Sequence, residues 1–225
     1  MFATTKTWNI EHARAFKKRH PQDKVYIITN RQRFTCEHVR RINPQIIFFP
    51  HWSWIIPADV YEKFSCVVFH MTDLPFGRGG SPLQNLIVRG YKKTKISAIK
   101  VTGRIDAGPI YLKRNLSLRG NADQILQRAS NIIFNKMVPF ILGHELRPRD
   151  QIGRPVVFNR RKPQDGNIEH FSSLPAVYDY IRMLDGEGYP RAFVNHNSLN
   201  FQLSSARLAH DKITATVEIR IGKNE

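Results

Sequence analysis

The sequence predicts an α/β fold built on an open, mostly parallel sheet with helices on its faces. Short and nearly continuous apolar runs recur in the first third of the chain, and their β-branched and aromatic content is typical of strands buried on both faces. These runs are residues 24–29 (KVYIIT), 45–50 (QIIFFP) and 66–69 (CVVF). A helical pattern at residues 8–20 precedes these runs, and another at residues 35–42 separates the first two. This alternation indicates βαβ units, which form parallel sheets.

The middle of the chain carries clear boundary signals for a further helix. Ser81 suits the N-cap of a helix and Pro82 suits its first turn, while Gly90 suits the C-terminal stop. The same kind of reading predicts four more elements: strands at 94–102 and 110–118, a long helix from about 121 to 142 that opens with the capping box NADQ, and a helix at 174–184.

The composition of the chain changes after residue 142. Residues 143–155 (GHELRPRDQIGRP) are rich in proline, glycine and charge, which is typical of a linker. We therefore expect a core domain over residues 1–145 and a small α+β extension over residues 146–225. Residues 213–221 (ITATVEIRI) alternate strictly between apolar and polar side chains, and residues 200–204 offer a partner strand, so the extension is expected to end in a β-hairpin. The pattern leaves open whether the extension forms a homodimer or covers a substrate.

The composition is typical of a folded cytoplasmic protein. Of the 225 residues, 41% are hydrophobic, which is enough for a large core. No apolar run approaches the ~20 residues of a membrane span, and the N-terminal residues show no signal-peptide pattern. Two cysteines, Cys36 and Cys66, are too few for a disulfide framework or a zinc site. We therefore predict a cytoplasmic protein with no metal and no membrane partner.

The formal net charge of +17 indicates an anionic partner. Nucleic acid, a membrane surface and a phosphorylated small molecule all fit this charge. The basic residues are spread along the whole chain, with no basic tail or arm. Because nucleic-acid-binding proteins concentrate basic residues in a patch or stripe, the even spread favours a phosphorylated small molecule over nucleic acid.

Two residues at predicted strand ends are candidates for acid–base chemistry. His70 ends the apolar run at 66–69, and Asp106 lies in a loop after another predicted strand, between Gly103 and Gly108. Ligands of open parallel sheets bind at the carboxyl ends of the strands. A histidine beside a carboxylate is the arrangement that orients imidazole for proton transfer. Taken alone, His70 is better explained as a structural histidine at the edge of the core than as a functional residue.

The pattern around these two residues is more specific than their spacing. The segments FHMTDLPFGRGGSPLQN (69–85) and ISAIKVTGRIDAGPIYLKRNL (96–116) combine a strand-end histidine, an Arg-Gly-rich loop after Leu-Pro, and a strand that leads into IDAGPI. This pattern resembles the folate-dependent formyltransferases, a group that includes enzymes for methionyl-tRNA, glycinamide ribonucleotide and nucleotide-sugar amines. The resemblance covers roughly residues 40–145. HWSWIIP (51–57) and RKPQDGNIE (161–169) are similar to loops of the same family.

The resemblance implies a Rossmann-like formyltransferase fold and transfer of a formyl group from 10-formyltetrahydrofolate to an amine. In that reaction His70 would stabilise the oxyanion and relay a proton, and Asp106 would orient His70. Glycines would let the backbone approach the flat pterin, and basic side chains would hold a diphosphate. The residues expected at the donor are Trp54, Ile55, Leu74, Phe76, Gly77, Arg78, Thr102, Gly103 and Asp106. Those expected at the acceptor are Asp73, Asn85, Arg160, Arg161 and Lys162.

One position departs from the family pattern. The family has an asparagine two residues before the histidine, where this chain has Val68. A carboxamide that would hold the formyl oxygen is therefore missing from its usual place. The nearest candidates to supply a donor are His51 and Asn85, of which His51 is slightly favoured as a third catalytic residue.

The resemblance favours a nucleotide-linked amino sugar as the acceptor. Residues 50–57 and 69–87 are most similar to sugar N-formyltransferases, including a branch associated with pseudaminic-acid-type sugars, which implies a UDP-linked 4-amino-4,6-dideoxy sugar. The residues after 150 are also few for the second domain of a full methionyl-tRNA enzyme. Two alternatives remain open. One is a formyltransferase for aminoacyl-tRNA or another small amine, and the other, suggested by Val68, is a non-catalytic folate- or ligand-binding module.

Overall fold

The computed structural model describes residues 1–222, which form two compact units. The first, called here the sheet unit, consists of residues 1–79, 94–116 and 127–157. The second, the hairpin unit, consists of residues 80–93, 117–126 and the chain from 158 onward. The chain passes between the units several times, so they do not follow one cut in the sequence. The division expected at residue 145 stays a prediction.

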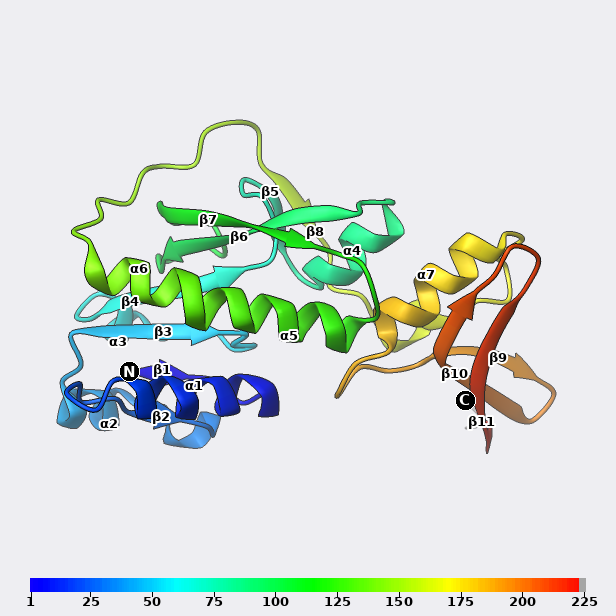
Figure 1. Ribbon diagram of the computed structural model, residues 1–225, viewed down its shortest axis with the longest axis horizontal. Helices are drawn as coiled ribbons and strands as arrows, with labels where there is room; N and C mark the ends of the chain where they lie inside the picture. Colours follow the sequence, from blue (N-terminus) through cyan, green and yellow to red (C-terminus); the bar gives the residue numbers. More distant parts are fainter. Residues whose placement is uncertain (223–225) are drawn as a thin grey trace. The chain divides into compact units, whose positions relative to one another are not determined.

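The sheet unit is built on a six-stranded sheet with the order β2-β1-β3-β4-β6-β7 (Figure 1). The first four strands in this order are parallel, and β6 is antiparallel to β4. The predicted α/β fold with a mostly parallel sheet is therefore confirmed. The strands are β1 (Phe2–Ala3), β2 (Ile27–Ile28), β3 (Ile46–Pro50), β4 (Ser65–His70), β6 (Lys93–Lys100) and β7 (Ile110–Ser117).

The register of the strands brings their carboxyl ends to one edge of the sheet. Pro50 of β3 lies opposite Phe69 of β4, so His51 and His70 follow at neighbouring strand ends. His70 in turn lies opposite Ser97 of the antiparallel β6. β1 runs parallel to β3, on the side of β3 away from β4. The carboxyl end of β1 therefore lies at the same edge of the sheet. The sheet thus gathers the loops in which a ligand site of this fold is expected.

Helices cover both faces of this sheet. On one face, the ring of Phe2 packs against those of Phe16, Phe48 and Phe134, with centroids 5.1–5.6 Å apart. On the other face, Ile47 and its buried neighbours in β3 and β4 pack against α2 and α3. The helical segments are α1 (Thr7–Arg19), α2 (Cys36–Ile42), α3 (Ala58–Tyr61), α5 (Ala122–Ile132), the π-helical turn η2 (Ile133–Met137) and α6 (Val138–Gly143).

The long helix predicted for residues 121–142 is present as α5, η2 and α6 in succession. Its predicted capping box is also present. The Asn121 side chain accepts a hydrogen bond from the Gln124 backbone N–H (3.0 Å), and the Gln124 side chain accepts one from the Asn121 backbone N–H (3.1 Å). These reciprocal bonds satisfy two backbone donors that a helix start otherwise leaves free.

A short two-stranded sheet of β5 (Phe76–Gly79) and β8 (Val156–Phe158) was not expected. The sequence indicated an exposed loop for the first segment, since glycine is a poor strand former. Its partner strand β8 begins directly after residues 143–155, which the sequence indicated as a linker. The Gly80 backbone N–H donates to the Phe158 carbonyl (2.9 Å), which extends this pairing. A pairing between segments so far apart in the chain has no local signal.

Ser81 does not have the expected role. Its backbone is left-handed (φ 48°), and its side chain does not cap α4 (Pro82–Val88). The Ser81 hydroxyl instead accepts a hydrogen bond from the Arg161 backbone N–H (3.0 Å). The prediction of the helix was correct, but the prediction of its cap was wrong because a distant segment takes the hydroxyl.

The hairpin unit holds a three-stranded antiparallel sheet with the order β11-β10-β9. The terminal hairpin is therefore confirmed, and β9 adds a third strand. Helix α7 packs against α4 and against β10. The elements are α7 (Leu174–Leu184), β9 (Ala192–His196), β10 (Leu199–Leu208) and β11 (Ile213–Ile221), and two 3₁₀ turns elsewhere in the chain are η1 (Arg31–Arg33) and η3 (Pro163–Gly166). Within residues 1–222, no helix combines the length and apolar character needed to cross a bilayer.

Candidate active site

The structure brings His70 and Asp106 together at the carboxyl edge of the sheet. His70 is the last residue of β4, and its Nδ1 lies 3.4 Å from Oδ2 of Asp106 in the loop between β6 and β7. Both side chains are largely shielded, with 10% and 17% of their surfaces exposed. An imidazole and a carboxylate from separate loops therefore meet where the fold places its ligands.

The second ring nitrogen of His70 fixes the position of a proton. Nε2 lies 2.7 Å from the Gly77 carbonyl, which can only accept a hydrogen bond, so Nε2 carries hydrogen. Nδ1 is then the nitrogen that faces the Asp106 carboxylate. At 3.4 Å, the carboxylate is placed to stabilise positive charge on the ring.

Asp106 is held in place through its backbone as well as its side chain. Its backbone is left-handed (φ 50°), a conformation that is uncommon outside glycine. Oδ2 accepts a hydrogen bond from the Gly79 backbone N–H (2.9 Å). Gly108, two residues later, lies so close to the Lys100 carbonyl that any Cβ would collide with it. This glycine is therefore needed for the packing of the loop against the protein itself.

Gln151 is a site residue that sequence reasoning missed. Its amide nitrogen donates to the Asp106 carbonyl (2.8 Å) and to the Gly108 carbonyl (2.9 Å). Its amide oxygen accepts from Nε (3.1 Å) and from an Nη (2.7 Å) of Arg78. One side chain thus joins the Asp106 loop to β5. No sequence signal marked this glutamine, because it stands alone in a stretch that is typical of a linker.

The position of the missing carboxamide is occupied by a half-buried Val68. His51, at the next strand end, has a left-handed backbone (φ 55°), and its ring packs edge-on against Trp8 at 5.9 Å. Burial, assisted by the positive charge of Lys6, lowers the pKa of His51 to about 4. His51 is therefore neutral near pH 7, with one N–H to donate.

Asp73 is poorly placed to receive an amine. Its carboxylate accepts a hydrogen bond from Lys113 Nζ and pairs with Lys95 Nζ at 3.0 Å. Burial acts to raise the pKa of the Asp73 carboxyl, but the hydrogen bonds from Lys113 and Lys95 outweigh it and hold this pKa below its usual range. Two ammonium groups therefore already neutralise this carboxylate.

The residues expected at the donor fall into three groups. Leu74 and Gly77 are buried beside the histidine, and Phe76 and Arg78 are half-buried in β5. Thr102 and Gly103 are exposed in the loop before Asp106. Trp54 and Ile55 are exposed by 38% and 83% in the loop after β3. Exposed apolar side chains at a strand-end edge suit a flat ligand.

The residues expected at the acceptor belong to the hairpin unit, apart from Asp73. The Asn85 amide donates to the carbonyls of Gly80, Ser81 and Asn159, so this carboxamide is committed to the fold. The Arg161 guanidinium donates to the Asp165 carbonyl (2.7 Å). Arg160 and Lys162 are exposed.

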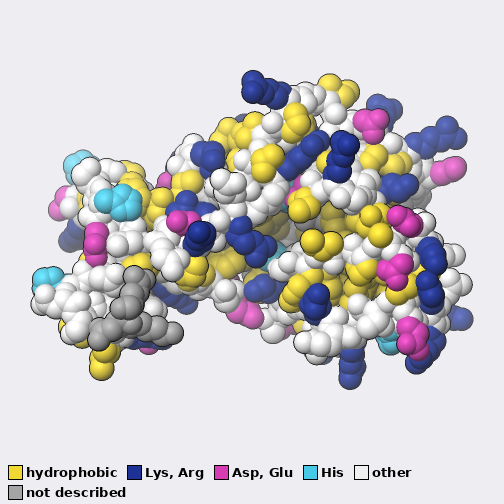
Figure 2. Space-filling view, turned by 180° about the vertical axis from the view of Figure 1, so that it is seen from behind, with side chains coloured by type: hydrophobic (Ala, Val, Ile, Leu, Met, Phe, Trp, Pro, Cys, Tyr) yellow, Lys and Arg dark blue, Asp and Glu magenta, His cyan; other side chains and the backbone are white. Residues whose placement is uncertain are grey.

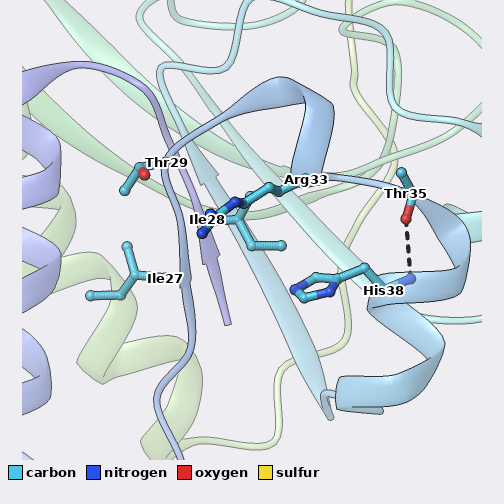
Figure 3. A pocket seen from close by; sticks show the side chains of 6 residues that line it. All are labelled: Ile27, Ile28, Thr29, Arg33, Thr35 and His38. Atoms are coloured by element: carbon cyan, nitrogen blue, oxygen red, sulfur yellow. Dashed lines mark hydrogen bonds between the residues drawn. The ribbon is translucent and has the colours of Figure 1, made fainter.

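A separate hollow of about 300 Å³ lies in the sheet unit, at the carboxyl end of β2 (Figure 3). Figure 3 shows the side chains of Arg33 and His38 extending toward β2 from η1 and α2. Nearby, the Arg31 guanidinium lies 6.0 Å from the ring centroid of the exposed Trp54. The lining combines a cation, hydroxyls and aliphatic groups from Ile27, Ile28, Thr29, Arg33, Thr35 and His38.

Known proteins similar to this chain are formyltransferases. Residues 163–220 match the family described as "Methionyl-tRNA formyltransferase, C-terminal domain". A methionyl-tRNA formyltransferase from Bacillus thuringiensis is 27% identical over 164 residues, which cover 69% of this chain and 52% of that protein. The match thus spans about half the length of this curated relative. The solved structure titled "Methionyl-tRNA formyltransferase from Clostridium thermocellum" is 56% identical, covers 98% of both chains and has a TM-score of 0.97.

The expectation of a sugar-nucleotide acceptor is wrong. A likely sugar N-formyltransferase from Mycobacterium tuberculosis covers 88% of this chain and 91% of its own, with a TM-score of 0.68, but is only 17% identical. Such a likeness shows the fold alone. The argument from length does not decide the acceptor, because the structure with the methionyl-tRNA name is covered to 98% whereas the match spans 52% of the curated relative. The same methionyl-tRNA names remove the support for the expectation that nucleic acid is a disfavoured partner.

The donor expected from the resemblance fits these relatives. A HypX structure from Aquifex aeolicus, titled as a complex with tetrahydrofolic acid, shares the fold with a TM-score of 0.74 at 15% identity. The identity of 56% over nearly the whole of both chains is much stronger evidence for family than this likeness. Together with the His70–Asp106 pair in the matched segments, it shows that this chain belongs to the formyltransferase family.

Proposed function

We propose that this chain transfers the formyl group of 10-formyltetrahydrofolate to the α-amine of methionyl-tRNA. The observation that carries the proposal is the 56% identity, over 98% of both chains, to the structure titled methionyl-tRNA formyltransferase. The curated relatives with the same name support the acceptor. The donor is the one that the family uses.

The His70–Asp106 pair suits the proton movements of this reaction. The neutral amine attacks the formyl carbon, so a new N–C bond forms and the formyl C–N bond of the folate breaks. The amine loses one proton, and the departing folate nitrogen gains one. His70 would donate a hydrogen bond from Nε2 to the developing oxyanion. Asp106, which lies beside Nδ1, would hold the ring in place and stabilise positive charge on it.

The contact of His70 with Gly77 has a consequence for this reaction. Both ring nitrogens already have partners, Asp106 on one side and the Gly77 carbonyl on the other. The formyl oxygen must therefore replace the Gly77 carbonyl at Nε2. The Thr72 hydroxyl also donates to this carbonyl (3.2 Å), so the carbonyl keeps a partner after the exchange.

His51 is the residue that we propose in place of the family's carboxamide. It is neutral near pH 7 and stands at the strand end beside His70. A neutral imidazole N–H is a hydrogen-bond donor, as a carboxamide is. Asn85 is not proposed, because its amide is already used by three carbonyls.

The charge of the molecule supports a polyanionic acceptor. The formal net charge is +17, and Figure 2 shows Lys and Arg side chains scattered over the visible face. In the sheet unit, the hollow lined by Arg33 and His38 has a size and chemistry that suit a phosphate of the RNA backbone. Trp54 beside Arg31 offers a surface on which an unpaired base can stack.

The test is to incubate the protein with 10-formyltetrahydrofolate and methionyl-tRNA, and to measure formylmethionine after hydrolysis of the ester. Formylation of methionyl-tRNA, with none of free methionine and loss of activity in His70→Ala, is the expected result. A protein that binds the folate but formylates methionyl-tRNA no faster than His70→Ala does would instead be a binding module. That outcome would overturn the proposed reaction.

A further inference from the structure

The chain between His70 and Gly77 forms a tight turn that returns to the histidine. The Phe76 backbone N–H donates to the Asp73 carbonyl (3.2 Å), which closes a β-turn over residues 73–76. The next residue, Gly77, places its carbonyl 2.7 Å from Nε2 of His70. The position of this turn therefore determines where the hydrogen-bond acceptor of the ring lies.

A lysine from the sheet binds the start of this turn at two points. Lys113 lies on β7, and its Nζ donates to the carboxylate of Asp73 and to the carbonyl of Leu74. The side chain of Lys113 is 26% exposed, so most of it is shielded from water. One ammonium group thus holds the side chain of the first turn residue and the backbone of the second.

A second lysine binds the same carboxylate but not the backbone of the turn. Nζ of Lys95, on β6, lies 3.0 Å from Oδ2 of Asp73. Within residues 1–222, Lys95 makes no hydrogen bond to a carbonyl of the turn. The two lysines bring the same charge to the same carboxylate. Comparing them therefore separates the effect of charge from the effect of the backbone hydrogen bond.

The fully buried Ser97 of β6 also holds the start of the turn. Its hydroxyl donates to the Thr72 carbonyl (2.7 Å) and accepts from the Leu74 backbone N–H (3.4 Å). At the other end of the turn, the Gly77 carbonyl is bound by the side chains of His70 and Thr72. The sheet thus anchors the first residues of the turn, from which the Gly77 carbonyl is presented to the ring.

We propose that Lys113 is a positioning residue for His70 and acts through this turn. By holding the Leu74 carbonyl, it keeps the Gly77 carbonyl within hydrogen-bond distance of Nε2. Hydrogen then stays on Nε2, and Nδ1 faces Asp106. The effect of Lys113 on turnover rests on the proposed function, whereas its effect on the ring does not.

Loss of the Lys113 ammonium affects the two groups that it binds in different ways. The Asp73 carboxylate stays paired with Lys95, so no uncompensated charge remains. The carbonyl of Leu74, a residue that is 1% exposed, loses the hydrogen bond from Nζ. A buried carbonyl without a partner is costly, so we expect the turn to shift until another donor reaches it. The Gly77 carbonyl moves with the turn.

The first test measures how fast the Nε2 proton of His70 exchanges with water, by NMR of protein labelled with 15N-histidine. The signal is identified by its absence from His70→Gln. Lys113→Met should speed the exchange roughly tenfold, because the Gly77 carbonyl no longer protects the proton. Lys95→Met, the matched control with the same loss of charge, should exchange as slowly as the wild type. Unchanged exchange in Lys113→Met, or equal acceleration in both lysine variants, would overturn the proposal.

The second test is the turnover of methionyl-tRNA. Lys113→Met should lower kcat roughly tenfold, because the ring is no longer well oriented. Lys95→Met should keep kcat within about twofold of the wild type, and any change in KM for methionyl-tRNA should be the same in both variants. An equal fall of kcat in both would assign the effect to charge and refute the role of Lys113. A wild type that does not formylate methionyl-tRNA would refute the proposed function, and the NMR comparison would still decide the role of Lys113.

Asp73→Asn covers the case in which Lys113→Met does not fold, which circular dichroism detects. The amide keeps an oxygen that accepts from Lys113, and the hydrogen bond to the Leu74 carbonyl is left in place. We therefore expect exchange at His70 within about threefold of the wild type. Roughly tenfold faster exchange in folded Asp73→Asn would show that the ion pair, and not the carbonyl hydrogen bond, positions the ring.

Discussion

His51 and His70 stand at the ends of neighbouring parallel strands, yet their surroundings differ in kind. His70 lies between a carboxylate and a carbonyl, so both of its nitrogens have partners. His51 lies against the indole of Trp8, within the field of Lys6, and its pKa is lowered to about 4. The same residue type at equivalent strand ends thus has polar partners at both ring nitrogens in one case and is kept neutral by burial in the other. The partners, rather than the strand position, decide the chemistry.

The largest expected effect comes from removing the charged partner of His70. Asp106→Asn should lower turnover of methionyl-tRNA by about 10²–10⁴-fold, the usual contribution of a general acid–base group. The amide keeps a similar size but no longer carries the negative charge beside Nδ1. Initial rates of formylmethionine formation give the measurement. Glu62→Gln, an exposed carboxylate of the same unit, should keep the wild-type rate. A loss of only a few-fold in Asp106→Asn would mean that the pair is structural.

A smaller effect is expected when the carboxylate remains but its support is removed. Gln151→Ala deletes the hydrogen bonds to the Asp106 and Gly108 carbonyls. We expect kcat to fall by roughly tenfold with little change in KM for the folate, because orientation of the pair is lost while binding surfaces stay. Gln151→Glu, which keeps the acceptor for Arg78 but loses the donor, separates the two halves of the network. A change confined to KM would show that Gln151 contacts substrate instead.

The environment of His51 predicts how stability depends on pH. Its pKa of about 4 in the folded protein is below the ordinary value of 6.5, so the folded state favours the neutral ring. The contribution of His51 to the free energy of unfolding is therefore fully present above pH 6.5 and is lost as the pH falls toward 4. The loss should be about 1–3 kcal/mol, allowing for the partial exposure of the side chain. Urea unfolding of the wild type and of His51→Gln at both pH values measures the difference.

Replacing Lys6 tests the electrostatic part of the lowered His51 pKa. Its positive charge is the second cause of the lowered His51 pKa, after burial. Lys6→Met should therefore reduce the acid-dependent loss of stability without removing it. Equal losses in the wild type and in His51→Gln would show that other groups carry the acid sensitivity.

The smallest expected effect comes from Arg33, which lines the hollow at the carboxyl end of β2. If the hollow holds an RNA phosphate, Arg33→Ala should reduce the salt slope of tRNA binding by about 1 and weaken affinity equally for different tRNAs. Filter binding across a series of salt concentrations measures the slope. Arg41→Ala is the control, since Arg41 pairs with Glu37 and neither residue lines the hollow. An unchanged slope in Arg33→Ala would exclude the hollow from RNA contact.

The parts of the site that the sequence predicted are those with a local pattern. The apolar run before His70 and the strand before Asp106 identified two strand ends, and the family pattern indicated that they meet. The sequence did not indicate Gln151, because a single glutamine in a polar stretch has no distinguishing neighbours. It misassigned the Ser81 hydroxyl for a related reason. That hydroxyl bonds Arg161, a residue too distant in the chain for any local rule to consider.

The sequence by itself determined most helices of the core, the strands of the parallel sheet and the terminal hairpin, but not β5, β8 or β9. These features follow from hydrophobic periodicity and capping, which act over a few residues. Only the tertiary structure decided that the His70 ring is held from both sides and that His51 is neutral. Each of these depends on groups brought together across long stretches of chain, where burial and hydrogen bonding act through space.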